Sequence, residues 1–190
     1  MKNIKLLKLY RHPTFLPPVG WSHNSNPTGK GQDIPRWWKK ANIKLRKEVL
    51  SERKLDEDIS AVCLVIAELS NVTIFCHSFN LKSEWYSNPQ VVANKDIKES
   101  IKLKKGGNSP SKGDMVYAEW LDATLNPTPA TVDEVRNSFG LIKVGQLGFL
   151  MHKNKSRVFI GGRYNATHKK YRHLEAIPTV NITKMVCLRG

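Results

Sequence analysis

The stretch GQLGFLMHKNKSRVFIGG, residues 145–162, decides the expected fold of the C-terminal part of the chain. GQLGFLMH and SRVFIGG each have the length and composition of a short strand, and the polar residues KNK separate them. Two such segments joined by a short polar turn are typical of a β-hairpin. In the second segment, a period of two places Arg157 and Phe159 on one face and Val158 and Ile160 on the other. We expect Val158 and Ile160 to face a core.

Three more segments around this hairpin have strand character: residues 115–121, 173–178 and 182–188. The residues IPTVN before the last of them fit one turn of 3₁₀ helix. Five short strands with one long loop after the first predict a small antiparallel β-barrel of the SH3-like or Sm-like kind over residues 113–190. We find no internal repeat in the sequence.

This pattern resembles a group of small proteins encoded by tailed phages and prophages. The matching stretches are VYAEWLDA at 116–123, GQLGFLMHKNKSRVFIGG at 145–162 and EAIPTVNITKMVCL at 175–188. The resemblance covers residues 113–190 only. It implies a viral or prophage source and a small barrel, and it carries over no catalytic residues.

The N-terminal part of the chain has a different character. Residues 1–33 carry proline, glycine and polar residues without lasting periodicity, so we expect an extended arm. Residues 34–54 place apolar residues every three or four positions after Asp33 and Pro35, which predicts an amphipathic helix with a basic outer face. The expected fold class is therefore α+β, with an arm and a basic helix followed by a five-stranded barrel.

Two apolar runs follow the helix, SAVCLVIAEL at 60–69 and NVTIFCHSF at 71–79. Residues 59–69 fit either a buried helix or a strand, so residues 34–103 are expected to be a helix with a hydrophobic hairpin or a helix–strand unit. Lysine, glycine, serine and proline dominate residues 104–112, which predicts a linker to the barrel.

Composition limits the classes of function. The 190 residues include 31 Lys and Arg against 16 Asp and Glu, giving a formal net charge of +15. A field of that sign attracts polyanions, above all nucleic acid. No apolar run is long enough to span a membrane, and the N-terminus lacks the features of a signal peptide. We therefore expect a protein of the host-cell cytoplasm, or of the virion, without a membrane partner.

No constellation of residues indicates catalysis or metal binding. Cys63, Cys76 and Cys187 are widely spaced, which favours reduced thiols, and the six histidines are scattered. We expect no enzyme activity, no catalytic residues, no metal site and no cofactor.

The strongest binding signal lies between His152 and His173, a stretch with seven cations and no acid. In a barrel these cations would lie on two neighbouring loops and the strand between them, and could contact phosphates together. Phe159 is positioned to stack on bases. The predicted nucleic-acid-binding residues here are Lys153, Lys155, Arg157, Phe159, Arg163, Lys169, Lys170 and Arg172. The basic face of the predicted helix adds Arg36, Lys39, Lys40, Lys44 and Lys47.

These observations predict an accessory protein that binds nucleic acid or a ribonucleoprotein by charge and shape, with weak sequence specificity. DNA and RNA both remain open as targets. The alternative is a virion structural or assembly protein, or an inhibitor that docks on a host protein, which the apolar residues of the arm favour. Assembly into a homo-oligomer through edge strands is also open.

Overall fold

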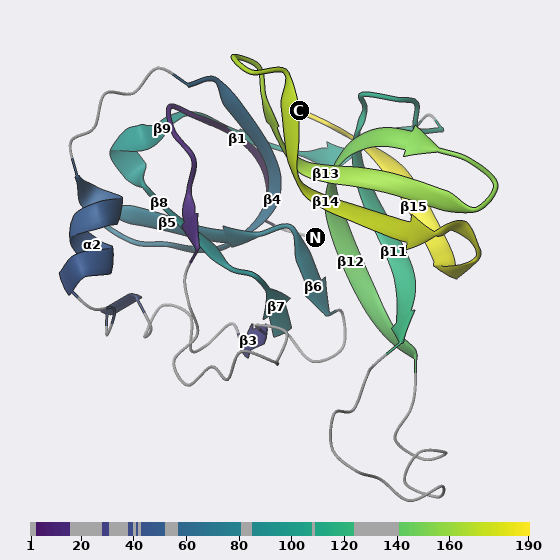
Figure 1. The fold of residues 1–190 in the computed structure, drawn as a ribbon, viewed down its shortest axis with the longest axis horizontal. Helices are drawn as coiled ribbons and strands as arrows, with labels where there is room; N and C mark the ends of the chain where they lie inside the picture. Colours follow the sequence, from purple (N-terminus) through teal and green to yellow (C-terminus); the bar gives the residue numbers. More distant parts are fainter. Residues whose placement is uncertain are drawn as a thin grey trace, which may run out of the picture.

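The computed structural model describes residues 3–15, 28–30, 38–39, 41, 43–51, 57–80, 85–107, 109–123 and 141–190. Antiparallel strands dominate these residues, and shared strands connect them into one hydrogen-bonded network (Figure 1). One α-helix has defined bounds here, α2 (Ile43–Leu50). No helix among the described residues is both long and apolar enough to cross a membrane.

Strands follow one another closely along the chain. The first half contains β1 (Ile4–Leu9), β2 (Thr14–Phe15), β3 (Thr28–Lys30), β4 (Ile59–Glu68), β5 (Val72–Cys76), β6 (Ser78–Asn80), β7 (Trp85–Ser87), β8 (Gln90–Ala93), the 3₁₀ turn η1 (Asn94–Asp96), β9 (Ile97–Lys102) and β10 (Lys104–Lys105). The second half contains β11 (Met115–Ala123), β12 (Leu141–Lys153), β13 (Arg157–Asn165), β14 (Lys170–Pro178), the 3₁₀ turn η2 (Thr179–Asn181) and β15 (Ile182–Arg189).

The two halves share one strand order. In the first half β1 pairs with β4, β4 with β5 and β5 with β8, and after η1 strand β9 returns to pair with β1. In the second half β11 pairs with β12, β12 with β13 and β13 with β14, and after η2 strand β15 returns to pair with β11. The structure therefore contains a topological repeat, although the sequence shows no internal repeat.

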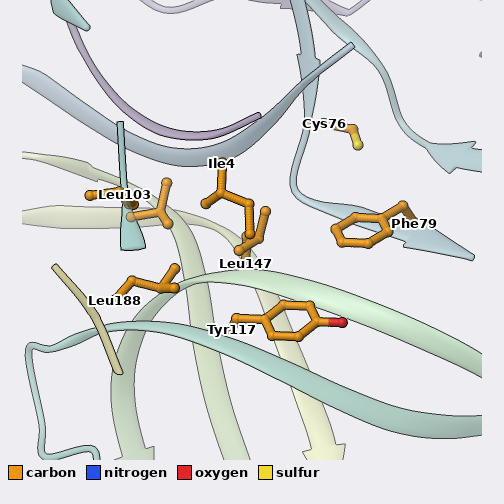
Figure 2. Packing of buried hydrophobic residues seen from close by; sticks show 8 residues of the cluster. Ile4, Cys76, Phe79, Leu103, Tyr117, Leu147 and Leu188 are labelled. Atoms are coloured by element: carbon orange, nitrogen blue, oxygen red, sulfur yellow. The ribbon is translucent and has the colours of Figure 1, made fainter. Parts of the chain in front are cut away.

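Strand pairing and a common core join the halves. β6 pairs with β12, and the start of β4 pairs with the end of β13. Buried side chains from both halves form one cluster, shown in Figure 2: Ile4, Val62, Cys76, Phe79 and Leu103 come from the first half, and Tyr117, Leu147 and Leu188 from the second. A Cβ at Gly145 would lie 2.7 Å from the Phe79 ring, so the glycine lets β6 approach β12.

This arrangement shows that the expected α+β fold with a separate five-stranded barrel is wrong. Each strand predicted in the second half is found, as β11, β12, β13, β14 and β15, and the predicted 3₁₀ turn is η2. However, β12 and β13 also hydrogen bond to strands of the first half, so the five strands continue a larger antiparallel sheet. Periodicity reports which residues form strands, whereas contacts distant in sequence decide which strands pair.

The run at residues 59–69, left open between helix and strand, forms the strand β4. β4 has three neighbours, β1, β5 and β13. Ala61, Val62 and Cys63 are consecutive and fully buried, so both faces of the strand are covered. A strand buried on both faces loses the alternation that normally distinguishes a strand from a helix.

The N-terminal arm and the long basic helix also differ from the expectation. Ile4–Leu9 is not an arm but the strand β1, which lies between β4 and β9, and its Leu9 is fully buried. Within the region predicted as helix, the structure defines α2 over Ile43–Leu50. Val49 of α2 packs with Trp38 against Val72 and Ile74 of β5.

Candidate nucleic-acid interface

Six of the cations predicted between His152 and His173 are exposed, in two groups at opposite ends of β13. We call them the β12–β13 patch, which consists of Lys153, Lys155 and Arg157, and the β13–β14 patch, which consists of Lys169, Lys170 and Arg172. The ends of β13 are roughly eight residues apart, which corresponds to about 26 Å along a strand. The predicted arrangement, two loops with a strand between them, is present, but the length of β13 separates its two groups of exposed cations.

The turn that carries the β12–β13 patch is held by its own hydrogen bonds. Asn154 Oδ1 accepts the backbone N–H of Ser156 at 2.9 Å and that of Arg157 at 2.8 Å. The backbone N–H of Thr179 donates to the carbonyl of Ser156 at 2.9 Å, which ties the turn to η2. The cations thus project from an ordered backbone, which lowers the entropy lost on binding.

The turn that carries the β13–β14 patch is held by the first half of the chain. The backbone N–H of Ala166 donates to the carbonyl of Asp58 at 2.7 Å, and the N–H of Asp58 donates to Thr167 Oγ1 at 3.1 Å. Lys169 has a φ of 54°, in the left-handed region that tight turns use. This patch is also presented on an ordered turn.

Three cations in or next to β1 are neutralised, whereas those of the patches are not. Lys5 lies 2.7 Å from Glu68, Lys8 lies 2.7 Å from Glu99, and Arg11 lies 2.5 Å from the buried Asp96. None of the six exposed patch cations makes an ion pair with an acid in the described part of the chain. Their charge is therefore available to a partner.

The predicted alternation in β13 is confirmed, because Val158 and Ile160 are fully buried. Phe159 is half-buried, and its ring centroid lies 6.1 Å from that of His152. Only part of the Phe159 ring is accessible for stacking on a base.

Arg163 does not lie with the exposed cations. It is 5% exposed, between Ala61 of β4 and Arg172 of β14 in the strand register. Its Nε and Nη1 atoms are buried without a hydrogen-bond partner among the described residues. Burial and the neighbouring Arg172 lower the pKa of Arg163 to about 10.

A cluster of two histidines beside Arg163 was not anticipated from the sequence. The ring centroids of His77 and His173 are 5.0 Å apart, and that of Phe15 lies 5.2 Å from His173. His77 Nδ1 hydrogen bonds to the Val62 carbonyl at 2.8 Å, and His173 Nε2 lies 3.1 Å from the amide nitrogen of Gln90. These residues come from segments far apart in the sequence, so no local motif marks them.

Both histidines are held in the neutral form. Burial, with the proximity of His173 and Arg163, lowers the pKa of His77 to about 3. Burial, with the proximity of Arg163 and Arg172, lowers the pKa of His173 to about 4. A Cβ at Gly162 would lie 2.6 Å from the His77 ring, so this glycine makes room for the cluster.

The helical cations form a separate surface. Lys39, Lys44 and Lys47 are exposed, whereas Arg36 and Lys40 lie outside the described residues. Beside them is a hollow of about 300 Å³, lined by Trp38, Lys39, Arg46, Leu69, Ser70 and Asn71. The Arg46 guanidinium lies 6.0 Å from the Trp38 ring centroid and donates to the Trp38 carbonyl at 3.0 Å.

The described residues give little support for a metal site or a nucleophilic cysteine. No group of three or more His, Cys, Asp or Glu in them could hold a metal ion. Burial raises the pKa of the Cys63 and Cys76 thiols, so both stay protonated at neutral pH and are weak nucleophiles.

No protein family, curated protein or solved structure matched the chain.

Proposed function

We propose that the chain binds nucleic acid by contacting its phosphates with the β12–β13 and β13–β14 patches, without a catalytic step. The observation that carries the proposal is the contrast in charge pairing. Cations near β1 are neutralised by acids of the same chain, whereas the six exposed patch cations have no acid beside them among the described residues. An exposed lysine or arginine without an acid beside it can neutralise a phosphate, and each such contact releases a counterion from the nucleic acid.

The expected specificity is weak. Phosphate contacts fix position and orientation but carry no sequence information. The residue best suited to stacking on bases, Phe159, is half-buried against His152. The proposal therefore covers both DNA and RNA.

The distance between the patches sets a minimum length of target. One strand of a duplex presents a phosphate about every 3.4 Å along the axis, so about 26 Å corresponds to roughly eight phosphates. A shorter duplex can engage only one patch at a time.

The proposed location, the cytoplasm, is based on three free cysteines. Cys63, Cys76 and Cys187 are all unpaired and buried. Disulfides are rare in the cytosol, where thiols are kept reduced. We place the proposed activity in the cytoplasm of a host cell, in line with the resemblance of residues 113–190 to proteins of tailed phages.

A length series tests the proposal. Affinity at low salt is measured for DNA and RNA duplexes of about 6 and about 16 base pairs, lengths on either side of the minimum. We expect the wild type to bind the longer duplex more tightly. The triple variant Lys153→Ala, Lys155→Ala, Arg157→Ala retains one patch, so it should lose this preference for length.

Two outcomes would reject the proposal. One is a wild type that binds no duplex or single strand at low salt, which would favour the alternative of a virion component or an inhibitor of a host protein. The other is a triple variant with an unchanged preference for the longer duplex, because the β12–β13 patch would then make no contact.

A homo-oligomer is a further part of the proposal. β14 pairs with β13 alone among the described strands, so its other edge offers backbone groups to a second copy. The solution mass measured with and without nucleic acid tests this part. A monomeric mass in both conditions would remove it.

A further inference from the structure

The guanidinium of Arg163 is a buried charge for which the described residues supply no counterion. Arg163 is 5% exposed, and its Nε and Nη1 have no hydrogen-bond partner among those residues. Removing a charged group from water is costly unless an opposite charge and hydrogen bonds replace the water. A ligand that supplies both would stabilise a group left in this state.

The side chains around Arg163 increase the need for an anion. Arg172 is its cross-strand neighbour and is exposed. His12, His77 and His173 feel the positive charge of Arg163, which contributes to the lowering of their pKa values. The surroundings are therefore basic rather than neutralising.

Glu57, which pairs with His12, is already engaged. Glu57 Oε2 lies 3.1 Å from His12 Nε2 and accepts a hydrogen bond from Asn165 Nδ2 at 2.6 Å. No ion pair joins Arg163 to Glu57 among the described residues, and burial, with the neighbouring Arg172, lowers the pKa of Arg163.

The position of Arg163 links it to the surface. Two residues further along β13, Asn165 uses its Oδ1 to accept the backbone N–H of His168 at 3.1 Å, inside the turn that carries Lys169 and Lys170. Asn165 therefore connects the strand that carries Arg163 to the turn that carries the β13–β14 patch.

We propose that Arg163 and Arg172 form a site for a phosphate-type oxyanion, free or within a phosphodiester, under the β13–β14 patch. The buried Arg163 would supply hydrogen-bond donors from its guanidinium, and the exposed Arg172 would supply a second positive charge. The inference rests on the proposed function, because it names the group of the nucleic acid that this patch would hold most tightly. Arginine suits the task because its planar guanidinium matches the geometry of phosphate oxygens.

The test measures binding of inorganic phosphate to the full chain by ³¹P NMR and by thermal unfolding, with sodium chloride of equal ionic strength as reference. A ligand that binds the folded state raises the unfolding midpoint. We expect phosphate to raise the midpoint of the wild type and of the control Lys102→Met, which removes one exposed cation of β9. Arg163→Met should abolish the rise.

A second variant covers the case in which Arg163→Met does not fold. Arg172→Ala changes an exposed residue, and it should weaken phosphate binding about tenfold, since it removes one charge-assisted hydrogen bond. No rise of the wild-type midpoint and no ³¹P broadening would overturn the inference. Equal responses of the wild type and the Arg163 or Arg172 variant would overturn it as well.

An oligonucleotide without terminal phosphates separates the two sources of phosphate. If inorganic phosphate displaces it, and more effectively than chloride does, the site holds a phosphodiester. If phosphate binds and the oligonucleotide does not, the site is one for free phosphate, and the proposed function fails while the inference stands. If the oligonucleotide binds and phosphate does not, the inference fails and the proposed function stands.

Discussion

The two halves of the sheet share a strand order, but the cations beside β1 and those at the two ends of β13 differ in their partners. Beside β1 of the first half, Lys5, Lys8 and Arg11 each face an acid of the same chain. At the two ends of β13 in the second half, exposed lysines and arginines face none among the described residues, and Arg163 is buried without a partner there. The sheet thus carries internal ion pairs beside β1, and at the two turns that flank β13 it carries cations without an acid beside them among the described residues.

The edge strands of the two halves also differ, because another strand covers one of them and none of the described strands covers the other. β8 in the first half is covered by β2, which pairs through Thr14 and Phe15. β14, at the corresponding place in the second half, pairs with β13 alone among the described strands. Natural sheets protect their edges from unwanted pairing, and charged residues are a common means. Lys170 and Arg172 are exposed on this edge strand.

The largest effect is expected at the buried ion pair of the first half. Arg11→Met leaves the fully buried Asp96 without its cation, which should lower the free energy of unfolding by about 3–5 kcal/mol. Denaturant unfolding measures the loss. Lys8→Met is the matched control, because Lys8 and Glu99 form an exposed pair of little energetic value. Equal losses in both variants would contradict a stabilising role confined to the buried pair.

The histidine cluster predicts acid sensitivity. Burial, with nearby Arg163 and Arg172, lowers the pKa of His173 to about 4, from about 6.5 in an unfolded chain. Between these values the unfolded chain binds a proton that the folded chain does not, so stability falls as pH drops from about 6.5 towards 4. The contribution of His173 is about 1.4 kcal/mol per pH unit.

A conservative variant isolates that contribution. His173 has a φ of 55°, which asparagine tolerates, so His173→Asn should fold and remove its share of the pH slope. The exposed His152→Asn is the control and should leave the slope unchanged. The measurement is denaturant unfolding at several pH values, and identical slopes for His173→Asn and the wild type would contradict the assignment.

A smaller effect is expected where the halves meet. Gly162→Ala places a Cβ about where the His77 ring lies, 2.6 Å from its Cγ, and overpacking of this kind costs about 1–3 kcal/mol. Gly107→Ala is the control, because a Cβ there meets no atom within 4 Å. If thermal unfolding shows equal midpoints for the two variants, Gly162 is not needed for the close packing of the cluster.

The smallest effect on stability is expected at the patches. Lys169→Ala with Lys170→Ala should change the free energy of unfolding by less than about 0.5 kcal/mol, because both side chains are exposed and pair with no acid among the described residues. Denaturant unfolding measures this. A loss comparable to that of Arg11→Met would show that the patch cations, like Arg11, contribute to folding.

The sequence predicted strands better where burial is one-sided. In β13, Val158 and Ile160 are buried and Phe159 is half-buried, so alternation was visible. β4 is covered on both faces, and its run of buried residues kept helix and strand equally plausible. In β1 the sequence IKLLKL lacks clear alternation, and its lysines pair with Glu68 and Glu99, far away along the chain. Such pairing cannot be inferred from local pattern.

The candidate site was predicted in composition but not in geometry. The basic residues between His152 and His173 were identified from the absence of acids among them. Their division between two ends of β13, and the burial of Arg163, follow from strand pairing with β4 and β14. The histidine cluster joins His77 to His173 across the two halves, and no sequence spacing encodes that contact.

The most direct test of the contrast between the halves is the salt dependence of nucleic-acid affinity for the wild type and two charge-matched variants. One variant is the pair Lys169→Ala and Lys170→Ala, and the other is the pair Lys102→Ala and Lys105→Ala from the first half, where the side chains are also exposed. The slope of log affinity against log salt changes by about 0.9 for each phosphate that the protein no longer neutralises. We predict a slope flatter by about two units for the patch variant and an unchanged slope for the first-half variant. Equal slopes in the two variants, or no binding by the wild type at low salt, would contradict the claim that the turns flanking β13 keep their charge for a nucleic acid.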